Sequence, residues 1–374
     1  MKQALVIHPR FFIYGGGELL CLYVCKTLQE EGYNVLLASD TFDPDSVDSI
    51  YGMGDVMRRC EWVQIPTFKA RYSHLLAFQR IFYAAGISHQ LDNLHPDIIF
   101  STQSSMYVLP GHIPLYHFIY DIVDLFAYPH VPEIYTRVFP IGGRGLHWKA
   151  YYWALRQIRK RKLPLPKPRE FFALSSTVLQ DLKREGHENS SLVYPPCPIA
   201  SFHPRPKKNR VIQVTRIVPQ KRLEVFIEIA RRLPEYQFYI IGRDTPILRD
   251  LNLGYSKKLF ADLPENLVYV ESPIRDCPEL LEESKVYLYT GIEPGIGIAL
   301  VEGVSAGCIP IAPLDGGGGE VVRAVGIGST FVDVDDAVEK VRKAMSSELD
   351  PLLVSGTAKM FSVESFQNVI RKIL

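Results

Sequence analysis

The feature that most constrains this chain is a repeated alternation of short β-branched runs with longer helical patterns. A helix is the usual connection between neighbouring parallel strands, and strands buried on both faces are apolar throughout. In the first half we expect helices at 17–31 and near 75–94, between strand-like runs at 4–9 (ALVIHP), 34–39 (NVLLAS), 97–102 (DIIFST) and 114–121 (PLYHFIYD). This rhythm predicts a parallel sheet covered on both faces.

The second half repeats the alternation, which predicts an α/β protein of two successive Rossmann-like domains. Strands are expected at 210–216, 237–243, 266–272, 286–290 and 308–313, and helices at 223–233, 278–284, from about 298, and at 363–374. Prolines at 195, 196, 198, 204 and 206 remove backbone donors, so an irregular linker is expected there. We therefore predict domains at 1–198 plus 358–374 and at 207–357.

Composition narrows the class of protein without identifying it. A chain of 374 residues exceeds what one core usually serves, and a net charge of +1 gives no global attraction to nucleic acid. The six cysteines are scattered, which indicates neither a zinc site nor a disulfide framework and favours a reducing cytosol. No secretory signal pattern or spanning apolar stretch is recognised, so a cytoplasmic protein with at most peripheral membrane contact is expected.

Three glycines, Gly15 to Gly17, follow the first strand and open the first expected helix. Glycine lets the backbone approach a ligand closely, and the N–H groups at a helix start attract phosphate. A tight strand-to-helix turn would give the same run. The glycines therefore indicate either a binding loop or a simple turn.

Two cations, Arg216 and Lys221, follow the first strand of the second half. The carboxyl ends of parallel strands line the crevice where ligands of open sheets bind, and cations there suit a diphosphate. The alternative is a pair of solvated loop charges.

The segment 291–322 carries the strongest indication of chemistry. Gly295 and Gly297 precede a helix that contains Glu302, and a second glycine cluster at 316–319 is followed by Glu320. Amides at a helix start can bind phosphate oxygens, and a carboxylate deeper in the helix can accept the paired hydroxyls of a ribose. Because Glu302 lies among apolar residues and glycine, its carboxylate needs a partner.

Taken in order along nearly the whole chain, these features resemble the family 4 glycosyltransferases of the GT-B fold, in which two Rossmann-like domains face a central crevice. The GGGE opening, the YPPC of 194–197 and the GIG…VE helix are most similar to the mannosyltransferases that extend lipid-linked oligosaccharides for asparagine glycosylation. The resemblance implies a retaining, metal-independent transferase that uses GDP-mannose and no further cofactor. A UDP-sugar donor is the alternative.

The resemblance also implies roles for single residues. Arg216 and Lys221 match the pair that grips the donor diphosphate, and Glu302 matches the carboxylate that binds the ribose. Glu293 matches a second glutamate near the donor sugar. Further donor-binding positions are Gly16, Gly17, Gly295, Ile296, Gly297 and Ile298, with backbone groups near Gly242, Pro273 and Ile274 expected to read the base. The implied mechanism has no protein nucleophile, since the departing diphosphate accepts the proton of the acceptor hydroxyl.

The sequence departs from the family pattern at two places. Eight residues separate Glu293 from Glu302 where seven are usual, so either the loop bulges by one residue or Pro294 takes the usual position. In addition, the histidine that many members carry at the end of a first-domain strand is missing.

Tyr120 and Asp121 end the corresponding strand here, with His117 three residues earlier. Strand alternation places His117 on the face opposite Tyr120. We therefore predict that Tyr120 or Asp121 lies at the active crevice and that His117 is a core or rim residue.

Residues 144–172 carry nine cations and one glutamate, with aromatic and aliphatic residues at helical spacing. Such a segment can lie in an anionic lipid interface. We predict that it faces the membrane or acceptor through Trp148, Tyr152, Arg156, Arg159 and Lys160. An amphipathic helix packed on the first domain is the main alternative, and nucleic acid is a weaker one.

The sequence thus predicts a transferase that moves a sugar onto a polyprenol- or phospholipid-linked acceptor at the cytosolic membrane face. Mannose is the predicted sugar. The alternatives are a transferase for a soluble acceptor, an epimerase on the same fold, and a catalytically silent nucleotide-binding protein. A Rossmann dehydrogenase is disfavoured, because the first glycine loop lacks the GxGxxG spacing.

Overall fold

The computed structural model describes residues 2–8, 11, 15–65, 87, 90–91, 93–102, 112–120, 168–244 and 255–374. The chain divides into two compact units, Met1–Pro196 with Phe366–Leu374, and Cys197–Ser365. Residues 358–365, predicted to join the first domain, therefore lie in the second unit. The second unit also begins ten residues before the predicted start at 207.

The first unit is built on a parallel sheet of seven strands in the order β3-β2-β1-β4-β5-β6-β7. The strand order reverses at β1, between β2 and β4, as in Rossmann folds, and ligands of such sheets bind outside the carboxyl ends of the strands. The strands are β1 (Gln3–Ile7), β2 (Asn34–Ser39), β3 (Glu61–Gln64), β4 (Ile98–Ser101), β5 (Leu115–Ile119), β6 (Glu170–Ala173) and β7 (Ser190–Leu192). The sequence predicted β1, β2, β4 and β5.

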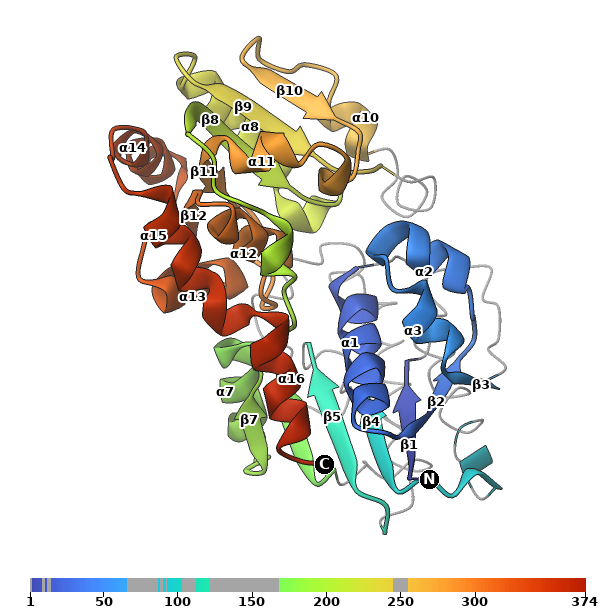
Figure 1. Ribbon diagram of the computed structural model, residues 1–374. Coiled ribbons are helices and arrows are strands. Elements are labelled where there is room, and N and C mark those ends of the chain that lie inside the picture. The colour runs from blue at the N-terminus through green and yellow to red at the C-terminus, as the bar shows by residue number, and fades with distance from the viewer. Residues whose placement is uncertain are drawn as a thin grey trace, which may run out of the picture. The chain divides into compact units, whose positions relative to one another are not determined.

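Helices α1 (Gly16–Glu30) and α16 (Val363–Arg371) pack together on one side of this sheet (Figure 1). Gln367 donates to Thr27 Oγ1 at 3.1 Å, and Arg371 pairs with Glu30 at 2.9 Å. Phe366 is buried beside the ring of Phe118 on β5, which explains the apolar stripe of the last helix. The other described helices of the unit are α2 (Pro44–Tyr51), α3 (Gly54–Arg58) and α7 (Ser176–Arg184).

The second unit is built on a parallel sheet of six strands in the order β10-β9-β8-β11-β12-β13. The strands are β8 (Lys208–Val214), β9 (Gln237–Ile241), β10 (Leu267–Val270), β11 (Ser284–Leu288), β12 (Ile309–Pro313) and β13 (Ser329–Phe331). The α-helices are α8 (Leu223–Arg232), α10 (Tyr255–Leu259), α11 (Pro278–Glu282), α12 (Ile298–Ser305), α13 (Gly317–Val325), α14 (Val334–Met345) and α15 (Pro351–Gly356). Apolar faces of α8 and α14 form a core with the strands.

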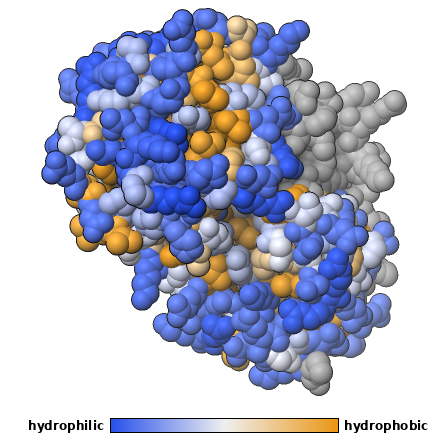
Figure 2. Space-filling model, turned by 45° about the horizontal axis from the view of Figure 1, so that its top comes forward, coloured by the Kyte–Doolittle hydropathy of each residue, from blue (hydrophilic) through white to orange (hydrophobic). Residues whose placement is uncertain are grey.

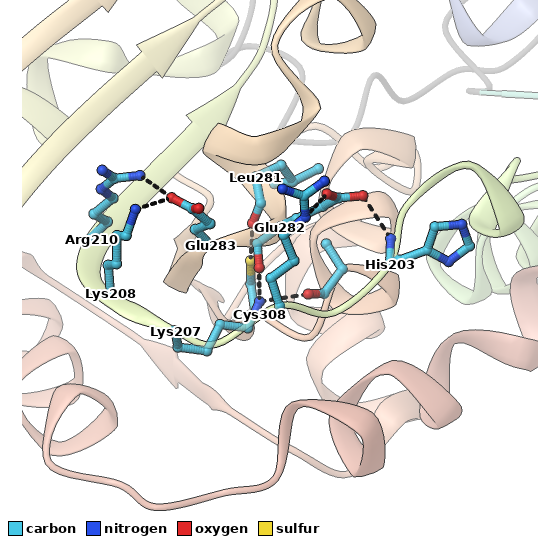
Figure 3. A network of polar contacts seen from close by, with 10 residues as sticks. His203, Lys207, Lys208, Arg210, Leu281, Glu282, Glu283 and Cys308 are labelled. Atoms are coloured by element: carbon cyan, nitrogen blue, oxygen red, sulfur yellow. Dashed lines mark hydrogen bonds and ion pairs between the residues drawn. The ribbon is translucent and has the colours of Figure 1, made fainter.

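The proline-rich segment between β7 and β8 contains one short 3₁₀ turn, η3 (Ile199–Ser201), and its second half is fastened to the second unit (Figure 3). The buried carboxylate of Glu282 accepts from the backbone N–H of His203 at 2.9 Å and pairs with Arg205 at 2.8 Å. Lys207 donates to the carbonyl of Glu282 at 2.7 Å. Residues 203–207 are therefore part of the second unit rather than a loose connection.

Several predictions from the sequence lie wholly or partly outside the described residues. The helix expected near 75–94 is described as helical at 87, 90, 91, 93 and 94, and residues 121–167 are not described. Across the parts that are described, no helix is both long and apolar enough to span a bilayer. The surface in Figure 2 is mainly hydrophilic, and large apolar side chains are exposed at Trp62, Val268, Leu314, Val332, Leu349, Leu352, Leu353 and Met360.

We expect Gly303→Ala to destabilise the second unit by about 1–3 kcal/mol, because a Cβ at Gly303 on α12 would meet the buried ring of Tyr287 at 2.3 Å. Gly356→Ala is the matched control, since a Cβ there meets nothing within 4 Å and its φ of −58° is helical. Urea unfolding should show the loss for the first variant and no loss for the second. Equal stability of both variants would contradict this packing.

Candidate functional site

The carboxyl ends of β8 and β9 lie against each other through a glycine. A Cβ at Gly242, which directly follows β9, would stand 1.8 Å from the carbonyl oxygen of Thr215 at the end of β8. Only glycine permits this approach, so Gly242 has a packing role beside the predicted binding role. Arg216 follows Thr215 directly and is thereby held at the carboxyl edge of the sheet, where ligands of open sheets bind.

Lys221 comes from the same edge, at the end of the 3₁₀ turn η4 (Pro219–Lys221). Arg222, the next residue, has φ 50° and begins α8 in the left-handed region, which is uncommon for a residue with a side chain. The carbonyl of Lys221 accepts a hydrogen bond of 2.6 Å from the hydroxyl of Thr290, at the end of β11. Two neighbouring strands therefore hold the Lys221 backbone in place.

The Lys221 ammonium forms an ion pair with the carboxylate of Glu293, in the loop after β11. Tyr289 completes the cluster: its hydroxyl donates to Glu293 Oε2 at 3.1 Å, and the ammonium lies 5.4 Å from the centre of its ring. The side chains of Lys221 and Glu293 are 14% and 21% exposed, so the pair is largely shielded from water and can still be reached by a ligand. Eight residues separate Glu293 from Glu302 where seven are usual in the family that the sequence resembles. Despite this longer spacing, Glu293 contacts Lys221.

The electrostatics of this cluster favour a charged carboxylate. Burial alone would raise the pKa of Glu293, but the ammonium of Lys221, the guanidinium of Arg216 and the hydroxyl of Tyr289 together hold that pKa below its ordinary value. Glu293 neutralises part of the positive charge of the two cations. The structure thus brings together Arg216, Lys221 and Glu293, three of the predicted site residues, and adds Tyr289.

The glycine cluster at 316–319 packs against the loop that carries Glu293. A Cβ at Gly317 would stand 2.2 Å from the carbonyl oxygen of Gly295, and one at Gly318 would stand 2.5 Å from the ring of Tyr289. The N–H of Gly317 donates to the carbonyl of Glu293 at 2.8 Å. These glycines let α13 touch the backbone of the loop, so they help to position it.

Helix α12 begins at the predicted binding positions Gly295 to Ile298. A Cβ at Gly295 would meet nothing within 4 Å, so the backbone there borders open space, whereas Gly297 lies against the ring of Tyr289. Ile296 is buried. The N–H groups of Ile298 and Ala299 have no hydrogen-bond acceptor among the described residues, as is usual in the first turn of a helix. The helix start therefore presents open donors.

Glu302 lies one turn into α12, and its backbone carbonyl accepts from the N–H of Ala306 and the hydroxyl of Ser305. Its carboxyl group has no hydrogen-bond or ion-pair partner among the described residues. Burial raises the pKa of its carboxyl group to about 7. Its sequence neighbours Leu300, Val301 and Val304 are fully buried in the core. The sequence predicted that this carboxylate needs a partner, and the structure supplies none from the described residues. The Glu302 side chain is only partly buried, so a ligand can reach its carboxyl group.

The predicted base-reading positions follow the outer strands of the sheet. Ile274 begins the 3₁₀ turn η5 (Ile274–Asp276) after β10, and Pro273 caps that turn. Gly242 is connected to β10 by its N–H, which donates to Val270 at 3.1 Å, and by its carbonyl, which accepts from Tyr269 at 3.1 Å. Both positions therefore lie at the carboxyl edge that also carries Arg216.

In the first unit, the glycine loop and Tyr120 meet at the carboxyl edge of the sheet. Gly15 caps α1, and the Glu18 carboxylate accepts its N–H at 2.8 Å. A Cβ at Gly17 would stand 3.2 Å from the hydroxyl of Tyr120, which donates to the carbonyl of Thr102 at 2.8 Å. Gly16 and Gly17 thus begin the helix beside Tyr120, while Asp121 lies outside the described residues.

His117 is fully buried on β5 and stacks on Phe171, so it is a core residue. Sequence reasoning missed another histidine at this edge. His8 directly follows β1, is fully buried, and lies 2.9 Å from the hydroxyl of Thr102 through Nδ1. Its position at the end of the first strand was the signal that could have identified it.

The aspartates of the two Asp-x-Asp triplets, at 43–45 and 333–335, have structural roles. Asp43 caps α2 and Asp333 caps α14, each accepting a backbone N–H, and Asp45 and Asp335 pair with Arg58 and Arg232. All six cysteines are free thiols. Among the residues that the structure describes, no cluster of histidine, cysteine or carboxylate side chains could hold a metal ion. The membrane-side residues Trp148, Tyr152, Arg156, Arg159 and Lys160 lie outside the described residues.

Residues 199–359 match the family described as "Glycosyl transferases group 1", and this range falls within the second unit. The second unit is therefore similar to group 1 glycosyl transferase domains over nearly its whole length. Arg216, Lys221, Glu293 and Glu302 all lie inside the matched range of this domain. Comparison with curated protein sequences gives no match.

Solved structures resemble the whole chain. HepE from Anabaena, in complex with UDP and glucose, is 15% identical with a TM-score of 0.69, covering 100% of this chain and 99% of that one. WaaG, a glycosyltransferase involved in lipopolysaccharide biosynthesis, is 16% identical with a TM-score of 0.68 and 99% coverage of both chains. Sucrose-phosphate synthase from Thermosynechococcus elongatus is 14% identical with a TM-score of 0.70, covering 100% and 98%.

At these identities the likeness establishes the fold. The chain has the predicted α/β architecture of two Rossmann-like domains, which is that of GT-B glycosyltransferases.

We expect Glu302→Gln to stabilise the ligand-free protein at pH 8. The folded-state pKa of about 7 lies above the ordinary 4.5, so the native state binds more protons, and stability falls as pH rises between these values. A shift of this size corresponds to a penalty of roughly 3 kcal/mol above pH 7, which glutamine does not incur. Urea unfolding at pH 5 and pH 8 should show the advantage of the variant growing with pH; a pH-independent difference would contradict the assignment.

Proposed function

We propose that the protein is a glycosyltransferase that transfers a sugar from a nucleotide-sugar donor bound at the carboxyl edge of the second sheet. The observation that carries this proposal is the shielded ion pair of Lys221 and Glu293, with the exposed Arg216 beside it, together with the partner-less carboxyl group of Glu302, all within the range that matches the group 1 family. The cations suit a diphosphate, and the carboxylate suits the two hydroxyls of a ribose. One ligand that carries both groups is a nucleoside diphosphate sugar.

The chemistry assigned to these residues is stabilisation of the leaving diphosphate. The Lys221 ammonium has three N–H donors, of which Glu293 takes one and the Tyr289 hydroxyl a second at 3.4 Å, so one donor remains for a phosphate oxygen. Arg216 and the open amides at the start of α12 add positive charge at the same edge. In a retaining transfer without a protein nucleophile, the bond from the anomeric carbon to the diphosphate breaks as the acceptor oxygen attacks the same face. The acceptor proton passes to the diphosphate.

The finer proposal is the one made from the sequence: mannose moves from GDP-mannose onto a polyprenol- or phospholipid-linked glycan, without a metal, at the cytosolic face of a membrane. It rests on the resemblance of the GGGE, YPPC and GIG…VE segments and on the basic aromatic segment 144–172. A UDP-sugar is the second donor candidate, because HepE is described in complex with UDP-glucose. The predictions that follow therefore use both nucleotide-sugars.

We expect nucleotide-sugar binding to strengthen as pH rises from 6 to 8. Glu302 accepts ribose hydroxyls as a carboxylate, and with a pKa of about 7 it is mostly protonated at pH 6. At pH 6 the carboxyl group must first lose its proton before it accepts the ribose hydroxyls. The affinity for the nucleotide-sugar should therefore be about tenfold lower at pH 6 than at pH 8. Titration calorimetry with GDP-mannose and UDP-glucose measures this directly, because the diphosphate diester of these ligands does not itself titrate in that range.

Glu302→Gln is the control for this dependence. It should lose the pH dependence and weaken binding at pH 8 by about ten- to a hundredfold, the cost of hydrogen bonds to a charged group. A 2′-deoxy nucleotide-sugar lacks one of the two ribose hydroxyls. The variant and the wild type should therefore bind this analogue with similar affinity. An unchanged pH profile in the variant would remove Glu302 from the ribose site.

We expect Lys221→Ala to lower the rate of sugar transfer or donor hydrolysis by at least a hundredfold, on the scale measured when one donor to a developing anion is removed. Lys340→Ala is the matched control, since Lys340 forms a partly exposed pair with Asp336 on α14. Release of nucleoside diphosphate from the donor measures both variants, and thermal unfolding checks their folding. Near-normal turnover by folded Lys221→Ala would contradict the role of Lys221. If the wild type binds the donor without any turnover, the protein is a catalytically silent nucleotide-binding protein.

A further inference from the structure

Two aromatic side chains form an exposed platform at the carboxyl edge of the first sheet. Trp62 lies on the edge strand β3, and its ring stacks with that of Phe42 at 5.6 Å between centres and 23° between planes. Despite this contact, Trp62 remains 40% exposed. We define these two residues as the aromatic platform.

The indole of Trp62 is fixed in direction by a hydrogen bond. Its Nε1–H donates at 3.2 Å to the carbonyl of Ser39, the last residue of the neighbouring strand β2. In the pairing of these strands, Trp62 lies opposite Leu37, two residues before Ser39. The side chain therefore runs along the strand toward its carboxyl end, the edge at which ligands of open sheets bind.

Phe42 directly precedes the capped start of α2. Asp43 caps this helix by accepting the N–H of Ser46 at 3.1 Å and its hydroxyl at 2.6 Å, and Pro44 occupies the first turn. Proline in the first turn and a carboxylate cap both favour one backbone conformation. The platform is thus preorganised, which lowers the entropic cost of binding a ligand on it.

The same helix connects the platform to the glycine loop. At the other end of α2, the hydroxyl of Tyr51 donates to the carbonyl of Gly15 at 2.8 Å. Eight residues of helix span about 12 Å, which separates Phe42 from Tyr51 by the length of a short oligosaccharide. The platform and the glycine loop are therefore two fixed points along one surface of the first unit.

The chemistry of the platform suits a sugar ring. An aromatic face carries negative charge and an apolar area, so it attracts the weakly positive C–H groups on the flat face of a pyranose. The hydroxyl groups at the rim of the sugar stay in water or bind polar groups, so the ring loses little hydration. A lipid chain or a peptide core would instead need a larger continuous apolar surface.

We propose that Trp62 and Phe42 form a distal subsite that binds one sugar residue of an oligosaccharide acceptor whose reacting end lies toward the Gly15–Gly17 loop. This inference rests on the proposed function, since it assigns the acceptor of that transferase to the class of saccharides longer than one residue. The aromatic platform would then recognise a sugar residue of the acceptor that is distant from the hydroxyl group that reacts.

The test uses the full-length protein on a printed glycan array. We expect binding to a set of oligosaccharides of two or more residues, a loss of at least tenfold in apparent affinity for Trp62→Ala and Phe42→Ala, and retention by Trp62→Phe, which keeps a stacking face. Val268→Ala is the matched control, because Val268 is also 40% exposed and lies on the edge strand β10 of the other sheet. It should bind as the wild type does.

A second measurement does not depend on the alanine variants folding. The chain has three tryptophans, so the emission of Trp62 is obtained as the difference between the wild type and Trp62→Phe, which keeps a stacking face. The Trp62 emission should shift on addition of an array-selected oligosaccharide and stay unchanged with the matching monosaccharide. Absence of glycan binding, or equal binding by Trp62→Ala, overturns the subsite; if nucleotide-sugars still bind the same preparation, the proposed function survives that failure.

Discussion

The ion pair between Lys221 and Glu293 is the interaction on which the geometry of the second unit's site depends. A charged pair is stable away from water only when its hydrogen bonds are satisfied, and Tyr289 supplies the additional donor to Glu293. The pair also joins the loops that follow two neighbouring strands, β8 and β11. A cation is thereby held beside open helix-start amides before any ligand binds, which is the preorganisation that electrostatic stabilisation of a leaving group requires.

The glycines of this unit serve that arrangement. Gly242, Gly317 and Gly318 each lie where a Cβ would collide with backbone or with a ring, so they bring α13 and the ends of β8 and β9 close to the ion pair. Glu302 has the opposite character, because its partly buried carboxyl group lacks a partner among the described residues and desolvation disfavours its charged form. A residue that costs stability in the free protein and is satisfied by a ligand is characteristic of a binding site.

The alternation of strands and helices was sufficient to predict the fold, because buried parallel strands are apolar throughout and their helices are amphipathic. Short edge strands such as β3 and β7 were missed, since few of their side chains are buried and their sequences lack the apolar pattern. Among the candidate residues, Arg216, Lys221, Glu293 and Glu302 were chosen through resemblance and spacing. Tyr289 and Trp62 could not be chosen, because their roles arise from contacts between segments distant in sequence.

The central claim is that the second unit binds a nucleoside diphosphate sugar at the carboxyl edge of its sheet. Thermal unfolding of the purified protein with GDP, UDP, ADP and their sugar conjugates tests it most directly, since a ligand that binds only the native state must raise the midpoint of unfolding. The account predicts a rise of the midpoint with at least one nucleotide and its sugar conjugate, selective for the base that the protein uses. No rise with any member of the panel would contradict it.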